Sequence, residues 1–215
     1  MQCMSDFVRT KVENYFDGGK KLFFKRGEMI IRAEEQPLGV MYLKSGIVKV
    51  YTISSKGEEV VVNIFKPGSF FPMSWALNDR KNNFFYEALT EVEIHRCLRD
   101  ETVTFVEKNP DVLLDLLKRV YSGLDGVLER MSYVMGEDAY ERLISEILIS
   151  VKRFGEKVGE DKYLLHFSEK DLAAQTGLTR ETVSREIKKL KTKNLITINK
   201  DQTMTVVLRG LQAER

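Results

Sequence analysis

The chain has 215 residues, of which 43% are hydrophobic and 31% charged, so it suits one large or two modest globular domains. No stretch approaches the roughly 20 apolar residues that cross a bilayer, and the opening MQCMSDFVRTKVENYF lacks the apolar run of a signal peptide. The two cysteines, Cys3 and Cys97, exclude a disulfide framework and a four-thiolate metal site within one chain. We therefore expect a cytoplasmic protein without a membrane partner.

The net charge of +2 is unevenly distributed along the chain. Residues 139–215 hold 15 Lys and Arg against 11 Asp and Glu, whereas the rest of the chain has a small acidic excess. A basic excess confined to one region favours an anionic partner there, such as nucleic acid.

The first element expected is a helix over residues 5–16, with Ser5 as its N-cap and Gly18-Gly19 after its end. From Lys21 to about Arg99, short β-branched and aromatic runs recur every 8–12 residues with turns between them. These runs are KLFF, EMIIRA, GVMYLKSG, IVKVYTI, EVVVNIF and EALTEVEIHRC. The pattern is typical of a β-sandwich or β-roll, which we place within residues 1–110.

A seven-residue repeat of apolar residues follows Pro110. Its members alternate in steps of four and three: Leu113, Leu117, Val120, Leu124, Val127, Met131 and Val134. This spacing predicts a long helix that pairs with a second copy of itself, and a single core helix is the alternative. A neighbouring apolar stripe is expected to pack on the roll: Val112, Leu116, Leu128 and Met135. We assign residues 111–137 to this dimerisation helix and a hinge.

The last domain is predicted over residues 138–215. Asp138 can cap a helix over residues 139–154, and Ser168 with Asp171 forms a capping box for a second helix. Gly177 is the natural left-handed residue that ends this second helix. After a turn in which Leu178 is expected to be buried, Thr179 can cap the next helix.

The spacing of this next helix turns its apolar residues inward and its charged residues outward. The inward set is Val183, Ile187 and Leu190, and the outward set is Arg180, Glu181, Ser184, Arg185 and Lys188. Two short helices joined by a glycine turn are typical of a helix-turn-helix, whose second helix enters the DNA major groove. The expected DNA contacts are Thr179, Arg180, Glu181, Ser184, Arg185, Lys188 and Lys189. The alternative is a helical hairpin with a charged outer face.

The segment LITINKDQTMTVVL then predicts two strands around a turn at residues 199–202, which form a wing. The β-roll, the long helix and a winged helix-turn-helix with TRETVSREIKKL together resemble the CRP/FNR family of bacterial transcription regulators. The resemblance spans nearly the whole chain and includes KRGEMII, YLKSGIVKV, the KPG turn before GSFF, and RETVSR.

The resemblance implies an α+β fold: an N-terminal β-roll like a cyclic-nucleotide-binding jelly roll, a long dimerisation helix and a C-terminal winged helix-turn-helix. It also implies a homodimer that binds double-stranded DNA at half-sites containing TGA. RNA polymerase is a further expected partner if the protein is an activator.

The sequence departs from the cyclic-AMP-binding members of this family. Gly68 is followed by Ser69 where those members have a glutamate, and Val127 and Leu128 stand where they have a hydroxyl pair. Members that sense haem use Cys or His where Pro72 and Ser74 stand here. We therefore identify no cofactor and expect a small-molecule effector other than cyclic AMP.

An aromatic-rich stretch predicts where such an effector would bind. The candidate pocket residues are Phe70, Phe71, Met73, Trp75, Arg80, Phe85, Val127 and Leu128. The same aromatic side chains can instead fill the roll and leave no pocket, and the sequence leaves both interpretations open.

Three other functions are weighed against a DNA-binding regulator. One is an effector-binding module that acts through protein contacts. Another is a redox-responsive regulator that uses His95 and Cys97, which share one face of a strand, although ordinary strand packing explains such a pair as well. The third is an enzyme, which we do not expect because His95 and His166 lie in separate modules and no nucleophile elbow or phosphate-binding loop is present.

Overall fold

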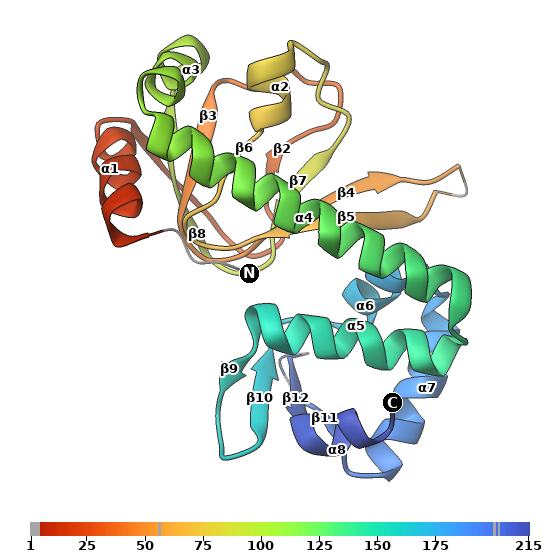
Figure 1. Ribbon diagram of the computed structural model, residues 1–215. Helices are drawn as coiled ribbons and strands as arrows, with labels where there is room; N and C mark the ends of the chain where they lie inside the picture. Colours follow the sequence, from red (N-terminus) through yellow and green to blue (C-terminus); the bar gives the residue numbers. More distant parts are fainter. Residues whose placement is uncertain (1–4, 56, 200, 202) are drawn as a thin grey trace. The chain divides into compact units, whose positions relative to one another are not determined.

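The computed structural model describes residues 5–55, 57–199, 201 and 203–215. Its contacts group the chain into two compact units (Figure 1). The first contains the chain up to Ile53 and Val61–Leu124, and the second contains Ser54–Val60 and Asp125–Arg215. No helix in the described ranges is long and apolar enough to cross a membrane.

The first unit is built on two four-stranded sheets that enclose a hydrophobic core. One sheet has the order β1 (Lys20–Phe24), β8 (Val92–Cys97), β3 (Val40–Ser45) and β6 (Phe70–Phe71). The other has the order β2 (Met29–Ile31), β7 (Phe85–Ala88), β4 (Val48–Ile53) and β5 (Glu59–Phe65). Leu43, Phe71 and Ile94 are fully buried between them. The predicted β-roll is confirmed.

The predicted run EALTEVEIHRC contains parts of two strands. β7 ends at Ala88 and β8 begins at Val92. The residues between them are held by the β3–β4 turn, because the amide of Leu89 donates to the carbonyl of Ile47 at 2.9 Å. The Thr90 hydroxyl accepts in return from the amide of Ile47, also at 2.9 Å. These two hydrogen bonds hold the turn between β7 and β8 against the turn between β3 and β4.

Helices cover the outer face of the first sheet (Figure 1). They are α1 (Asp6–Asp17), α2 (Met73–Asn78), α3 (Arg99–Lys108) and the first part of α4 (Pro110–Gly136). Ser5 caps α1 as predicted and accepts from the amide of Val8 at 3.4 Å. A second hydrophobic core lies under these helices and contains Phe16, Tyr42, Phe70 and Trp75. The sequence did not predict α2 and α3, which are short.

The long helix α4 runs without interruption over 27 residues. Val112 and Leu116 lie in the core beneath it, as predicted for the second apolar stripe. The other two members of the stripe, Leu128 and Met135, are exposed and belong to the second unit, so their predicted packing on the roll stays a prediction. These two residues follow Leu124, where the contacts of α4 change from the first unit to the second.

The second unit contains a helical core and a small sheet. Its helices are α5 (Ala139–Phe154), α6 (Glu169–Thr176), α7 (Arg180–Thr192) and α8 (Leu208–Ala213). The sheet has the order β11 (Ile196–Ile198), β12 (Met204–Val207), β10 (Lys162–Leu165) and β9 (Glu156–Lys157). Strands β11 and β12 form the predicted wing, although residues 200 and 202 of its turn lie outside the described residues. β9, β10 and α8 were not predicted.

Candidate DNA interface and effector region

The turn between α6 and α7 has the geometry of a helix-turn-helix. Gly177 adopts a left-handed φ of 68° and its amide donates to the carbonyl of Ala173 at 2.9 Å, so that α6 ends there. The Thr179 hydroxyl accepts from the amide of Thr182 at 3.2 Å and starts α7. Both caps were predicted, and so was the box of Ser168 and Asp171 at the start of α6. Leu178 is half-buried rather than buried.

Helix α7 presents one face to the core and the other to solvent. Val183, Ile187 and Leu190 are fully buried, which fixes the rotation of the helix about its axis. All seven predicted DNA contacts are exposed, on the opposite side of α7 or at its N-terminal end: Thr179, Arg180, Glu181, Ser184, Arg185, Lys188 and Lys189. The structure therefore brings the predicted set together on one helix.

A buried carboxylate on α7 was not predicted. Glu186 is only 3% exposed, and it binds the exposed Arg185 with 2.9 Å between Nε and Oε1. Its other oxygen lies 2.5 Å from the ammonium of Lys189. The close ammonium of Lys189, joined by the hydrogen bond from Arg185, lowers the pKa of Glu186 against the opposing effect of burial. The spacing of three between Glu186 and Lys189 indicates a pair on a helix, whereas adjacent residues such as Arg185 and Glu186 do not normally face each other.

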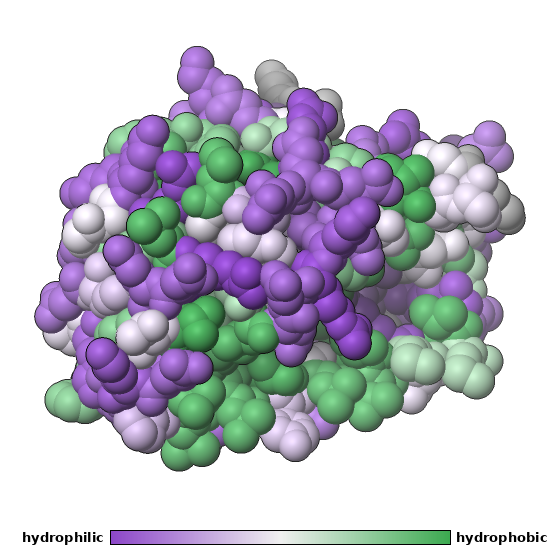
Figure 2. Space-filling model, turned by 90° about the horizontal axis from the view of Figure 1, so that it is seen from above, coloured by the Kyte–Doolittle hydropathy of each residue, from purple (hydrophilic) through white to green (hydrophobic). Residues whose placement is uncertain are grey.

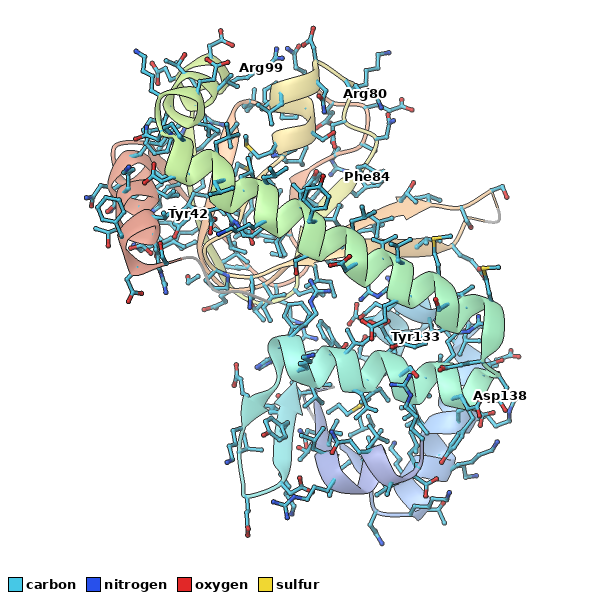
Figure 3. The ribbon with its side chains drawn as sticks, viewed as in Figure 1. Tyr42, Arg80, Phe84, Arg99, Tyr133 and Asp138 are labelled. Carbon is cyan, nitrogen blue, oxygen red and sulfur yellow. The ribbon has the colours of Figure 1, made fainter. Side chains whose placement is uncertain are left out.

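The end of α4 is joined to α5 by ion pairs within the second unit. Arg130 donates to both carboxylate oxygens of the buried Glu146, at 3.1 and 2.7 Å. Burial raises the pKa of Glu146, although the charge of Arg130 opposes this effect. Near Asp138, which caps α5 (Figure 3), the Ser145 hydroxyl donates to Glu137 at 2.8 Å. The last part of α4 is therefore fixed to α5, which packs against α6 and α7.

The predicted dimer seam of α4 is uncovered in the single chain. Its seven residues are 45% to 60% exposed: Leu113, Leu117, Val120, Leu124, Val127, Met131 and Val134. A further exposed apolar row, one residue in every seven, widens this face: Leu114, Tyr121, Leu128 and Met135. Figure 2 shows hydrophobic side chains gathered along the lower edge of its view. An apolar face of this size is typical of a surface that another chain covers.

The aromatic residues of the candidate effector pocket do not line a single cavity. Phe70 and Phe71 lie on opposite faces of β6, because successive strand residues alternate. Inside the roll, the Phe71 ring stacks with those of Phe65 and Tyr86, at 5.0 and 5.2 Å between ring centres, and those two rings also contact each other. Phe70 belongs to the core beneath the helices. This part of the roll is filled by aromatic side chains.

The other candidate pocket residues are also dispersed. Trp75 is buried on α2 under the guanidinium of Arg99, which lies 5.2 Å from the ring centre, and Met73 packs beside the same core. Phe85 stacks on Tyr51, and Arg80 is exposed on the loop after α2 (Figure 3).

The last two candidate pocket residues, Val127 and Leu128, are exposed on α4. Neither of the surface hollows beside α3 and α1, of about 440 and 450 Å³, is lined by any of the eight predicted residues.

A polar contact connects the turn before this aromatic stretch to α4. Arg119 donates to the carbonyl of Gly68 at 2.9 Å, pairs with Asp115 at 2.8 Å and lies over the ring of Phe70 at 4.9 Å. Burial lowers the pKa of the Arg119 guanidinium, while Asp115 opposes the shift. Gly68 has a φ of 90°, which favours glycine at this turn.

His95 and Cys97 lie beside α1 without forming a metal site. The ring nitrogens of His95 lie 3.1 Å from Asp17 and 2.9 Å from Glu93. Burial raises the pKa of the Cys97 thiol, which disfavours the reactive thiolate. Among the residues that the structure describes, no group of three or more His, Cys, Asp or Glu side chains is arranged so that it could hold a metal ion. Of the two interpretations of this pair, these contacts favour ordinary strand packing.

The family models match both units of this architecture. Residues 21–109 match the cyclic nucleotide-binding domain, and residues 141–213 match the Crp-like helix-turn-helix domain. The chain belongs to the CRP/FNR family of transcriptional regulators. This CRP/FNR chain is a DNA-binding regulator with an effector domain, as the sequence resemblance predicted. The family is one of transcriptional regulators and not of enzymes.

Relatives and solved structures agree with this family and fold. The chain is 27% identical over 180 residues to the global nitrogen regulator of Nostoc sp. The match covers 82% of this chain and 81% of that protein. It is 28% identical over 166 residues to the nitrogen fixation regulation protein FixK of Rhizobium meliloti, covering 77% of the chain and 72% of the relative. A CRP/FNR regulator structure from Thermus thermophilus has a TM-score of 0.73 at 23% identity, covering 90% of this chain and 97% of that one.

Proposed function

We propose that this CRP/FNR regulator acts as a homodimer that reads an inverted repeat with TGA in each half-site. The observation that carries the proposal is the exposure of Arg180, Glu181 and Arg185 on α7, opposite its buried apolar face. In this proposal residues 1–110 sense the effector, residues 111–137 form the dimer and residues 138–215 bind DNA.

The side chains on α7 suit direct reading of base edges. An arginine can donate two parallel hydrogen bonds to O6 and N7 of guanine, and a glutamate can accept from N4 of cytosine. Arg180 and Arg185 are the proposed guanine readers on the two strands, and Glu181 is the proposed cytosine reader. Lys188 is exposed on the same helix and suits a phosphate contact.

The exposed seam of α4 supports the dimer. Two copies paired along this seam have a two-fold axis, and a two-fold protein matches a palindromic DNA site. The two α7 helices then enter successive major grooves, so half-site centres lie roughly 34–36 Å apart. Whether the bound dimer activates or represses depends on where its site lies in the promoter, and RNA polymerase is the expected partner for activation.

The effector is proposed to be a small molecule other than cyclic AMP. Ser69 lacks the carboxylate for a ribose, and Val127 and Leu128 offer no polar group to the edge of a purine. An unpaired polar group that becomes buried costs about 1–3 kcal/mol. We expect calorimetric titration of cyclic AMP to show no binding at micromolar concentrations, and a micromolar dissociation constant would contradict this part of the proposal.

Selection of duplexes from a random pool by the purified protein tests the DNA site, with and without cell extract to supply an effector. An inverted repeat with TGA half-sites is expected. Arg180→Ala and Arg185→Ala should each cost about 1–3 kcal/mol of binding free energy and relax the preference at one base pair. If wild-type protein binds no duplex in either condition at low salt, a function through protein contacts is favoured instead.

A further inference from the structure

We propose that Glu186 is a positioning residue: it fixes how Arg185 is presented to a base and keeps Lys189 away from the DNA phosphates. The inference rests on the proposed function, because it assigns Arg185 to a base edge. It adds a residue that the helix-turn-helix pattern does not indicate, since Glu186 is buried and does not face the DNA-reading side of α7.

The burial of the three side chains shows which one is the anchor. The Glu186 side chain is 4% exposed, whereas those of Arg185 and Lys189 are 62% and 55% exposed. Each oxygen of this carboxylate faces one of the two cations, Oε1 the guanidinium of Arg185 and Oε2 the ammonium of Lys189. Because one carboxylate that solvent hardly reaches pairs with two long side chains that extend into solvent, we take the carboxylate as the anchor of the three.

Glu186 contacts Nε of the Arg185 guanidinium, an atom that is not needed when the two terminal amino groups bind a base. Glu186 Oε1 lies 2.9 Å from Nε of Arg185, and no contact within the described chain engages the two terminal amino groups of Arg185. These two groups are the parallel donors that fit O6 and N7 of guanine. The Glu186 contact therefore orients the guanidinium plane and leaves its outer edge free for a base.

The second carboxylate oxygen of Glu186 pairs with Lys189 but not with its neighbour Lys188, so the two lysines differ in the charge that they offer to DNA. Lys189 lies 2.5 Å from Glu186, while the Lys188 ammonium makes no ion pair with any described residue. A paired lysine offers less net charge to a phosphate than a free one, so it releases fewer counterions on binding. Lys188 then contributes to the salt dependence of DNA binding, whereas Lys189 contributes little while Glu186 is ionised.

The variant Glu186→Gln tests both parts, because it keeps the shape of the side chain and removes its charge. The alanine variants of Arg180 and Arg185 first show which base pair each arginine reads. Binding of Glu186→Gln is then measured to the matched duplex and to two further duplexes, each of which has one of these two base pairs substituted. Each is measured over a range of salt concentrations. Glu160→Gln is the charge-matched control, because Glu160 is exposed and lies away from α7 in the sequence.

With Glu186→Gln, discrimination at the Arg185 base pair should fall roughly 3- to 10-fold, while discrimination at the Arg180 base pair stays unchanged. Binding to scrambled DNA should strengthen, and its salt dependence should steepen by about one counterion because Lys189 is released. Glu160→Gln should leave the discrimination at both base pairs unchanged. Equal loss at both base pairs, or no loss at either, would overturn the proposal. If wild-type protein itself shows no preference for matched DNA, the proposed function fails and this inference fails with it.

A measurement on the wild-type protein covers the case in which Glu186→Gln does not fold. The Nε proton of Arg185, assigned in nitrogen-15 NMR spectra by its loss in Arg185→Lys, should exchange slowly with water at neutral pH. Its resonance should also shift when the carboxylate is titrated at acid pH. Fast exchange of this proton, like that of a freely solvated arginine, would show that Glu186 does not hold Arg185 in solution and would overturn the proposal.

Discussion

Arg119 on α4 donates to the main-chain carbonyl of Gly68, at the turn that precedes the aromatic stretch of the roll. The two residues are 51 positions apart, and the contact links a turn of the roll to α4, the helix that carries the proposed dimer seam. A rearrangement of the turn at Gly68 would therefore change a contact that α4 makes within the first unit.

Replacing Arg119 with alanine should lower the free energy of unfolding by about 2–3 kcal/mol. The substitution leaves the carbonyl of Gly68 and the carboxylate of Asp115 without their charged partner in a largely buried setting. Urea unfolding at one fixed protein concentration measures this loss. Lys118→Ala is the control, because Lys118 is exposed on the same helix. Equal, small effects of the two substitutions would mean that the Arg119 contacts are not stabilising.

Replacing Leu124 with glutamate should separate the proposed dimer. Leu124 is half-exposed in the middle of the seam, so pairing two copies would bury two new carboxylates against apolar side chains. Sedimentation at micromolar concentration should show a monomer, and binding to a palindromic duplex should weaken strongly. Lys118→Glu, which adds a carboxylate outside the seam, should remain dimeric. A dimeric Leu124→Glu would exclude this helix as the interface.

The parts of the fold that the sequence predicted are those that depend on local chemistry. Asp138, Ser168 and Thr179 each cap the helix expected of them, because a cap needs only a side-chain oxygen and the next few amides. The rotation of α7 follows equally from the spacing of its three apolar residues. These features involve contacts within a few positions, which a pattern of residue types can represent.

The rest depends on partners distant in sequence or on elements too short to have a period. Helix α2 has six residues and β9 has two, so neither contains a repeating apolar pattern. The Arg119–Gly68 contact needs the folded roll. The separation of Phe70 from Phe71 follows from strand alternation, but only once those two residues are known to form a strand.

Replacing Gly177 with alanine should lower the free energy of unfolding by about 1–2 kcal/mol. The cost is conformational, because a φ of 68° is unfavourable for alanine while a β-carbon at this position would meet nothing within 4 Å. Asparagine tolerates the left-handed conformation better, so Gly177→Asn should be less destabilising than Gly177→Ala. Thermal unfolding of the three proteins compares them. A larger loss for asparagine would show that the space around the turn, and not its backbone angle, sets the cost.

The carboxylate of Glu13 should make the stability of the first unit depend on pH. It accepts from Arg9 at 3.1 Å, from Lys44 at 3.2 Å and from the hydroxyl of Tyr42 at 3.0 Å. Partial burial raises the pKa of Glu13, but these donors outweigh it and the pKa in the folded protein lies below its ordinary value.

A carboxyl group with a lowered pKa stabilises the fold when it is ionised in both states, which is above its ordinary pKa of about 4.3. The contribution disappears as the pH falls through the lower pKa of the folded state, because the proton must then be bound there as well. Wild-type protein should therefore have a higher Tm than Glu13→Gln at pH 6–7, and the difference should shrink steadily below about pH 4. Glu107→Gln is the control, since Glu107 is exposed on α3; its difference from wild type should be small throughout. A gap between wild type and Glu13→Gln that stays constant from pH 7 to pH 3 would mean that the lost interaction does not depend on the charge of Glu13.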